Sequence, residues 1–232
     1  MSCAVLRVVV VLGSPRARGN SATVGSLVES QSREWGAQNG SSVHVDMLDL
    51  AAVPVGGCTG CGSCSRTGRC VIEDAMGGYY DLIDRADALV WVTPIYFGSI
   101  PSQLKAFVDR FQVFWARRQA RATRSIPNPY HARRPGLMVA VRGGGDPFGY
   151  DAAIVPIRSA SNLAEVTLAE PLIVEGTNER TDMANVEFAG DRRAVADAVD
   201  ALLDRAADWC AAEPTTHDNR STWVGFEGGS VA

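Results

Sequence analysis

A chain of 232 residues, 46% of them hydrophobic, is long enough to form one domain with a substantial core. Its formal net charge of -4 lacks the basic excess of nucleic-acid-binding proteins, so we expect no nucleic-acid partner. The apolar run near the start, at residues 8–12, is far shorter than a membrane span. We therefore expect a cytoplasmic protein with no membrane partner.

The apolar pattern, taken in chain order, predicts alternating strands and helices. Residues 6–12, LRVVVVL, are a nearly continuous β-branched run ended by Gly13, which predicts a strand buried on both faces. Residues 21–35 then have helical apolar spacing, with Asn20 or Ser21 as the N-terminal cap. Similar patterns predict further strands at residues 43–50, 88–92, 137–141 and within 166–174, and further helices at residues 74–85, 101–115, 150–163 and 192–210.

Five strands that alternate with helices indicate a three-layer α/β/α fold built on a five-stranded parallel sheet. We expect this domain to occupy residues 1–212, with a cysteine-rich loop at residues 56–70. Residues 213–232 are rich in Thr, Gly and Ser, so we expect a loosely ordered tail or a segment that lies on a partner. In such sheets ligands bind beyond the carboxyl ends of the strands, so the loops there are the candidate sites.

The loop after the first strand, GSPRARGNS, combines small residues and hydroxyls with the N-terminus of a helix. Backbone N–H groups and the positive end of the helix dipole favour an anion there, and Ser14, Arg16, Asn20 and Ser21 would complete a phosphate site. A tight turn followed by a capped helix is the alternative. The loop matches neither G-x-G-x-x-G nor G-x-x-x-x-G-K-S/T, which disfavours dinucleotides and nucleoside triphosphates.

The loop after the third strand, TPIYFGSIPSQLK, suits a flat heteroaromatic ring. Pro94 and Gly98 would shape a turn that presents backbone groups beside Tyr96 and Phe97, so that a ring can both stack and form hydrogen bonds. Core packing of Ile95, Tyr96 and Phe97 is the alternative. Together, the first and third loops indicate a mononucleotide with a planar ring.

Two further stretches are less specific. The loop RGGGDPFGY after the fourth strand holds Gly143 and Gly144, which either allow a ligand close to the backbone or form a long surface turn. A basic stretch around IPNPYH could guide a phosphorylated nicotinamide cofactor or an acidic partner, but a solvated face or an oligomer contact is the simpler interpretation. Its arginines are Arg117, Arg118, Arg121, Arg124, Arg133 and Arg134.

Four cysteines lie within thirteen residues of the loop after the second strand, in the sequence GCTGCGSCSRTGRC. A cysteine that fills a core sits singly on an apolar face, whereas this C-x2-C-x2-C-x5-C spacing lies among Gly, Ser, Thr and Arg. Thiols three residues apart in a glycine-rich loop can turn toward one point and hold a metal ion or an iron–sulfur cluster. Zinc, a thiol–disulfide pair and inert thiols are the alternatives to a cluster. The four residues are Cys58, Cys61, Cys64 and Cys70.

Three motifs together carry a family resemblance: GSPRARGNS, GCTGCGSCSRTGRCVIEDAM and TPIYFGSIPSQLKAFVDR. They resemble the NADPH-dependent FMN reductase family of flavodoxin-like proteins over residues 8–110, and the cysteine spacing is similar to that of its iron–sulfur flavoprotein branch. The resemblance implies a sheet of order 2-1-3-4-5, with the FMN phosphate on residues 14–22 and the isoalloxazine ring against residues 94–98. It also implies that the four cysteines hold a 4Fe-4S cluster.

The resemblance implies an FMN-dependent oxidoreductase that takes electrons from NAD(P)H or another donor and passes them to a small-molecule or protein acceptor. It further implies a homodimer or homotetramer that completes the flavin site, with NAD(P)H docked only transiently over the ring. A non-catalytic electron-transfer or redox-sensing protein and a zinc-binding regulatory module are the alternatives. We expect no catalytic acid or base, because the flavin performs the chemistry. The expected cofactor-binding residues are Ser14, Arg16, Gly19, Asn20, Ser21, Ala22, Pro94, Ile95, Tyr96, Phe97, Gly98, Gly143 and Gly144.

Overall fold

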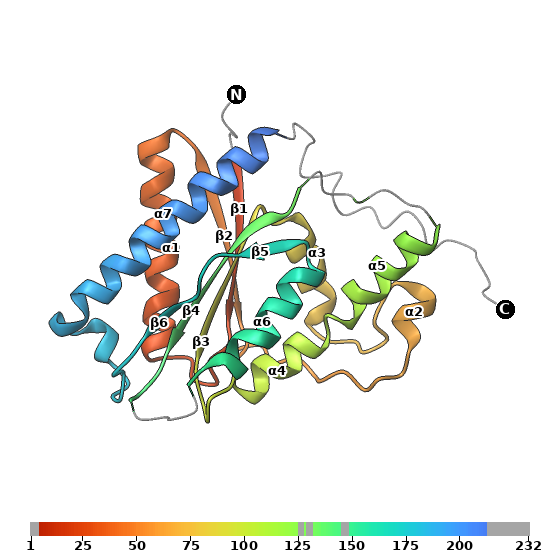
Figure 1. Ribbon diagram of the computed structural model, residues 1–232, viewed down its shortest axis with the longest axis horizontal. Helices are drawn as coiled ribbons and strands as arrows, with labels where there is room; N and C mark the ends of the chain where they lie inside the picture. The colour runs from red at the N-terminus through yellow and green to blue at the C-terminus, as the bar shows by residue number, and fades with distance from the viewer. Residues whose placement is uncertain (1–4, 125–127, 129–131, 145–148, 213–232) are drawn as a thin grey trace.

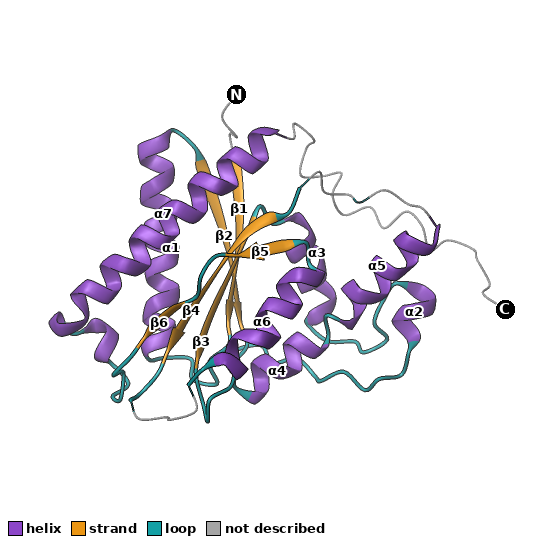
Figure 2. Ribbon diagram, in the orientation of Figure 1, coloured by secondary structure: helices purple, strands orange, loops and turns teal. Residues whose placement is uncertain are grey.

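A parallel β-sheet runs through the middle of the protein, with helices on both of its faces (Figure 2). The strands are β1 (Val5–Leu12), β2 (Ser42–Asp49), β3 (Ala88–Pro94), β4 (Arg134–Val141), β5 (Val166–Leu168) and β6 (Leu172–Val174). Their order is β2-β1-β3-β4-β5, and β6 also pairs with β4. All pairings are parallel, so the expected order 2-1-3-4-5 is confirmed.

The central strands are apolar because both of their faces are covered. Every residue of β3 and β4 is buried, and Leu6 and residues 8–11 of β1 have no exposed surface. β2, at the edge of the sheet, keeps the alternating burial of a half-exposed strand over its first residues. The apolar runs in the sequence therefore mark the strands that lie in the middle.

Two short strands, rather than one, fill the last position of the sheet. Pro171 lies between β5 and β6, and proline has no N–H to donate to a neighbouring strand. β5 pairs with the start of β4, and β6 pairs with its end. The sequence predicts one fifth strand within residues 166–174. The structure has two there, because Pro171 has no N–H to pair with β4.

Helices cover the two faces of the sheet in separate groups (Figure 1). One face carries α1 (Asn20–Asn39) and α7 (Ala189–Ala212), which pack on each other. The opposite face carries α3 (Met76–Arg85), α4 (Ser102–Asp109), α5 (Gln112–Arg124) and α6 (Asp151–Leu163). A short helix, α2 (Ser63–Thr67), packs on α5, and two 3-10 turns precede α7, η1 (Asp182–Ala184) and η2 (Val186–Phe188).

Two helix predictions are wrong in detail. α1 begins directly after Gly19 with no side-chain cap, so neither Asn20 nor Ser21 caps it. The helix expected at residues 101–115 is two helices, because the N–H groups of Arg110 and Phe111 bond to carbonyls three residues back and end α4. The chain is thereby redirected before α5 begins.

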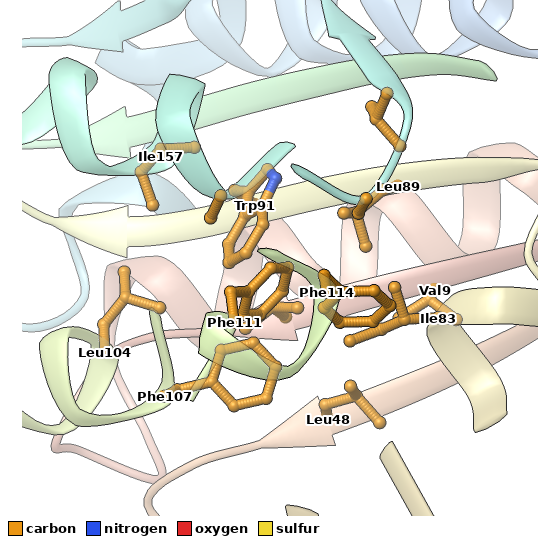
Figure 3. Close-up of a cluster of buried hydrophobic side chains, with 14 of the residues drawn as sticks. Val9, Leu48, Ile83, Leu89, Trp91, Leu104, Phe107, Phe111, Phe114 and Ile157 are labelled. Carbon is orange, nitrogen blue, oxygen red and sulfur yellow. The ribbon is translucent and has the colours of Figure 1, made fainter. Parts of the chain in front are cut away.

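An aromatic cluster fills the core between the sheet and the helices α3 to α6 (Figure 3). Phe107 packs edge-on against both Trp91 and Phe111, with ring centroids 6.1 and 5.5 Å away. The ring of Phe114 continues the cluster, 5.0 Å from that of Phe111. The indole N–H of Trp91 donates to Ser161 Oγ at 2.9 Å, so this buried donor is satisfied.

A proline inside α6 leaves one carbonyl that another segment uses. Pro156 has no N–H, so the carbonyl of Ala152 lacks the hydrogen bond that it would accept in a regular helix. Ser99 Oγ donates to that carbonyl at 3.4 Å. The bond joins α6 to the loop after β3 and compensates for the helix bond that the proline removes.

This computed structural model describes residues 5–124, 128, 132–144 and 149–212. The tail expected at residues 213–232 lies outside the described residues. Within the described ranges, no helix combines the length and the apolar character needed to cross a bilayer.

We expect replacement of Phe107 by alanine to lower the free energy of unfolding by about 3–5 kcal/mol, because its ring is fully buried against two others. Phe97→Ala is the matched control. Phe97 is fully exposed, so its loss should change that free energy by no more than about 0.5 kcal/mol. Urea denaturation followed by circular dichroism measures both values, and equal losses in the two variants would contradict the packing.

Candidate functional site

The turn between β1 and α1 forms one wall of a depression at the edge of the sheet. Gly13 sits so close to α4 that a Cβ there would lie 2.5 Å from Leu104 Cδ2. Ser14 is buried, and its Oγ accepts the backbone N–H of Arg16 at 3.1 Å. The first N–H groups of α1, which have no acceptor within a helix, follow directly. This helix N-terminus with Arg16 beside it favours an anion.

Loops from several strand ends line this depression, whose enclosed part measures about 80 Å³. Residues that follow β1, β3, β4 and β6 meet there, as the rule for parallel sheets predicts. The expected residues that line it are Ser14, Arg16, Gly19, Asn20, Ser21, Pro94, Ile95, Tyr96 and Gly143. The expected residues that do not line it are Ala22, Phe97, Gly98 and Gly144.

The side chain of Asn20 mainly holds another loop in place. Its Nδ2 donates to the carbonyl of Glu179 at 2.7 Å, and its Oδ1 accepts the N–H of Met183 at 3.0 Å. These two bonds join the start of α1 to the segment that leads into α7. An anion at this helix would therefore meet the backbone of Asn20 more readily than its amide.

The loop after β6 is a wall of the depression that the sequence patterns did not identify. A Cβ at Gly143 would lie 2.7 Å from Asn178 Oδ1, so this loop closely approaches the loop after β4. A signal was available, because the rule that ligands bind beyond the carboxyl ends of parallel strands also covers the last strand. The missed lining residues are Val141, Arg142, Thr177, Asn178, Glu179 and Arg180.

The loop after β3 is a tight turn that presents an aromatic ring to solvent. Tyr96 and Ser99 exchange two backbone hydrogen bonds, of 2.8 and 3.0 Å. The φ angles of the two central residues, Phe97 and Gly98, are +50° and +70°, as in a type I′ turn. This backbone conformation costs a non-glycine residue about 1 kcal/mol or more, and the Phe97 ring is fully exposed. Neither feature stabilises the isolated chain.

Positive charge gathers around the depression. Arg16, Arg142 and Arg180 line it, and Glu179 supplies the one carboxylate among its described lining residues, while Nε of Arg142 lies 3.2 Å from Oε1 of Glu175 nearby. The Arg142 guanidinium lies over the ring of Tyr150, 5.4 Å from its centroid. The excess of guanidinium groups over carboxylates matches the anion preference of the helix N-terminus.

A second cavity, of about 310 Å³, lies in the segment between β2 and α3. All four cysteines line it, so the structure brings together the whole set that the sequence spacing predicted. Arg110, Gln112 and Val113 form its other side, where α4 gives way to α5. Figure 1 shows the cysteine segment extending to α2 beside α5, away from the ends of β4 and β6. The depression and this cavity share none of their lining residues.

Two of the four sulfurs accept hydrogen bonds from the backbone. The N–H of Gly60 donates to Cys58 Sγ at 3.4 Å. A hydrogen bond from the backbone of Ser63 holds the pKa of Cys61 below its ordinary value. Burial raises the pKa of Cys64, whose thiol lies 3.8 Å from the carbonyl oxygen of Gln112. Bonds donated to sulfur favour the thiolate, which is the form of cysteine that binds metals.

The four cysteines line the same cavity. Within the described ranges, no three His, Cys, Asp or Glu side chains are gathered as they would be around a single metal ion. Zn–S bonds are about 2.3 Å long, so four sulfurs on one zinc ion would leave no cavity between them. An iron–sulfur cluster holds its cysteine sulfurs further apart, around a core of several atoms. Four thiolates are the ligand set of an iron–sulfur cluster as well as of a structural zinc ion, so the donor set suits either group.

The sequence pattern of the family described as NADPH-dependent FMN reductase matches residues 6–157. Two curated relatives, iron-sulfur flavoproteins from Archaeoglobus fulgidus and Methanosarcina thermophila, are each 30% identical to this chain over 105 residues. The match covers 45% of this chain, and 45% and 52% of the two relatives. The chain thus matches about half the length of these relatives.

A solved structure of an oxidoreductase from Corynebacterium diphtheriae resembles this protein, with a TM-score of 0.58 at 14% sequence identity. The similarity covers 91% of this chain and 100% of that chain, and it shows a shared flavodoxin-like fold. The family pattern spans more than half of the chain, including the loops after β1, β2 and β3. The chain belongs to the NADPH-dependent FMN reductase family.

Proposed function

We propose that this protein is an FMN-dependent oxidoreductase that takes electrons from NAD(P)H or another donor and passes them to a small-molecule or protein acceptor. The depression at the carboxyl edge of the sheet carries the proposal, because it combines a helix N-terminus, three arginines and an adjoining aromatic turn. Membership in the FMN reductase family supports a flavin as its ligand.

The residues of the depression suit the two ends of FMN. Ser14, Arg16 and the first N–H groups of α1 would hold the phosphate, by charge-assisted hydrogen bonds. Tyr96 and Phe97 would lie against the isoalloxazine ring, whose flat faces suit aromatic stacking. When bound, FMN accepts a hydride as two electrons and can release them singly. The side chains position this ring, and none is needed as an acid or base.

We further propose that Cys58, Cys61, Cys64 and Cys70 hold a 4Fe-4S cluster. The shared cavity and the hydrogen bonds to sulfur support this ligand set. Two curated relatives are iron-sulfur flavoproteins, which agrees with this ligand set. When bound, such a cluster carries single electrons and so complements the two-electron chemistry of a flavin.

The exposed aromatic turn supports assembly into a homodimer or homotetramer. Phe97 is fully exposed and Tyr96 is partly exposed, next to the depression. A second copy that covers this turn would bury the Phe97 ring and complete the flavin site. NAD(P)H would then dock only transiently over the exposed side of the ring. We place the protein in the cytoplasm, without a nucleic-acid or membrane partner.

We expect Arg16→Ala to weaken FMN binding about tenfold or more, because a hydrogen bond to a charged group contributes about 1.5–3 kcal/mol. Arg18→Ala is the matched control, since Arg18 is exposed in the same loop and does not line the depression. The change in FMN fluorescence on binding gives the dissociation constant. Wild-type affinity in both Arg16→Ala and Ser14→Ala would sink this assignment.

We expect Cys64→Ser, purified without oxygen, to contain much less iron and sulfide than the wild type, because a hydroxyl is a poor ligand for an iron–sulfur cluster. Ser65→Ala is the control, since Ser65 is the exposed neighbour and does not line the cavity. Iron, acid-labile sulfide, zinc and FMN analyses give the contents. Stoichiometric zinc without flavin in the wild type would favour a zinc-binding regulatory module instead.

A further inference from the structure

Arg110 donates hydrogen bonds to the backbone at both ends of the cysteine loop. Its side chain is 1% exposed. Nη1 donates to Asp74 Oδ2 and to the carbonyl of Gly56, each at 2.8 Å. Nη2 donates to Asp74 Oδ1 at 3.0 Å and to the carbonyl of Ile72 at 3.4 Å. Gly56 precedes the first cysteine and Ile72 follows the last, so one guanidinium group closes the loop.

One donor of this guanidinium group has no partner. Arginine has five N–H donors, and the bonds from Nη1 and Nη2 account for all but the one on Nε. Nε of Arg110 is buried and has no hydrogen-bond acceptor among the described residues. A buried donor without an acceptor costs about 1–3 kcal/mol. Because Arg110 lines the cavity with all four cysteines, an acceptor bound in the cavity would remove that cost.

Arg110 also brings a lasting positive charge to the cavity. Burial by itself lowers the pKa of Arg110, but the hydrogen bonds to Asp74 outweigh burial and raise that pKa above its ordinary value. Burial likewise opposes ionisation of Asp74, and the bonds from Arg110 outweigh it, so the pKa of Asp74 is lowered. Both groups therefore stay charged near neutral pH. Asp74 accepts hydrogen bonds from Arg110 and from the backbone N–H groups of Gly56 and Met76.

We propose that Arg110 is a positioning residue for the four-cysteine cluster and that its Nε–H donates a hydrogen bond to a sulfur of the bound cluster. This inference rests on the proposed function, in which the cavity holds a 4Fe-4S cluster. One-electron reduction makes the bound group more negative by one charge unit, so a charged N–H donor stabilises the reduced form more than the oxidised form. Arg110 thereby raises the reduction potential.

Arg117, on α5, provides a matched control for Arg110. It is also buried, and its Nη1 is 3.0 Å from Asp84 Oδ2. Its Nε donates to the carbonyl of Gly68 at 2.9 Å, so it supports the same loop. Arg117 does not line the cysteine cavity, and it lines a separate pocket that includes Cys70. Lysine at either position keeps the positive charge and removes Nε. R110K therefore loses a donor that has no partner among the described residues, whereas R117K loses a donor that is bonded to the carbonyl of Gly68.

The test uses the full chain, reconstituted without oxygen with ferrous iron and sulfide and then reduced with dithionite, which supplies the one electron for each cluster. We expect R110K to favour the oxidised form about tenfold at a fixed potential, which is a fall of about 59 mV for a one-electron couple. We expect R117K to keep the wild-type midpoint potential while losing a similar amount of stability. Electron paramagnetic resonance of reduced protein containing isotopically labelled arginine should show nitrogen coupling in the wild type and R117K, and none in R110K.

The outcomes separate this inference from the proposed function. Wild-type potential and nitrogen coupling in R110K would overturn the role of Arg110 and leave the cluster in place. Equal shifts in R110K and R117K would also overturn it, because they would reflect loosening of the loop. If R110K holds no cluster, its reduction potential cannot be measured, and the wild type decides. A reduced wild-type cluster without nitrogen coupling from labelled arginine would then overturn the role of Arg110. A wild-type chain that takes up no iron and sulfide defeats the proposed cluster, and the role of Arg110 with it.

Discussion

The parallel arrangement of the strands is the constraint on which the candidate flavin site depends. β1, β3 and β4 are buried on both faces, so they cannot carry a polar site along their length. Polar ligand-binding groups lie instead in the loops at the carboxyl edge of the sheet, where the parallel strands all end. Gly13 and Gly143 let these loops approach each other and α4 closely. A depression with a helix N-terminus at its centre is the result.

The cysteine loop meets a different constraint, because it has little regular structure of its own. Buried ion pairs replace the missing hydrogen-bond ladder, one between Arg110 and Asp74 and one between Arg117 and Asp84. Removal of one partner of such a pair leaves a buried charge and costs about 3–5 kcal/mol. α4 begins just after the aromatic turn of the depression and ends at Arg110. One short helix therefore joins the two cavities.

Local patterns in the sequence were enough to predict most of the sheet and the first three loops. A β-branched run and its closing glycine are adjacent in the chain, so β1 and the turn at Gly13 could be predicted. The gathering of the four cysteines could be predicted too, because they lie within thirteen residues. The resemblance to a known family supplied the strand order, which local patterns alone leave open.

Features that depend on distant partners could not be predicted. The sequence places Arg110 in a predicted amphipathic helix, and only the folded structure shows that it donates a hydrogen bond to Asp74. Arg117 belongs to a basic stretch interpreted as a solvated face or an oligomer contact, yet it is buried against Tyr80 and Asp84. The choice of partner for a charged side chain is made by tertiary packing, for which a single sequence carries no periodic signal.

The central claim is that electrons pass between a flavin in the depression and a cluster in the cysteine cavity. The most direct measurement is an anaerobic titration of the fully loaded protein with NADH or NADPH, followed by visible absorption and electron paramagnetic resonance. We expect the flavin absorption to bleach, the signal of a reduced cluster then to appear, and electron uptake to exceed that of the flavin alone. A bleached flavin with no cluster signal would contradict it.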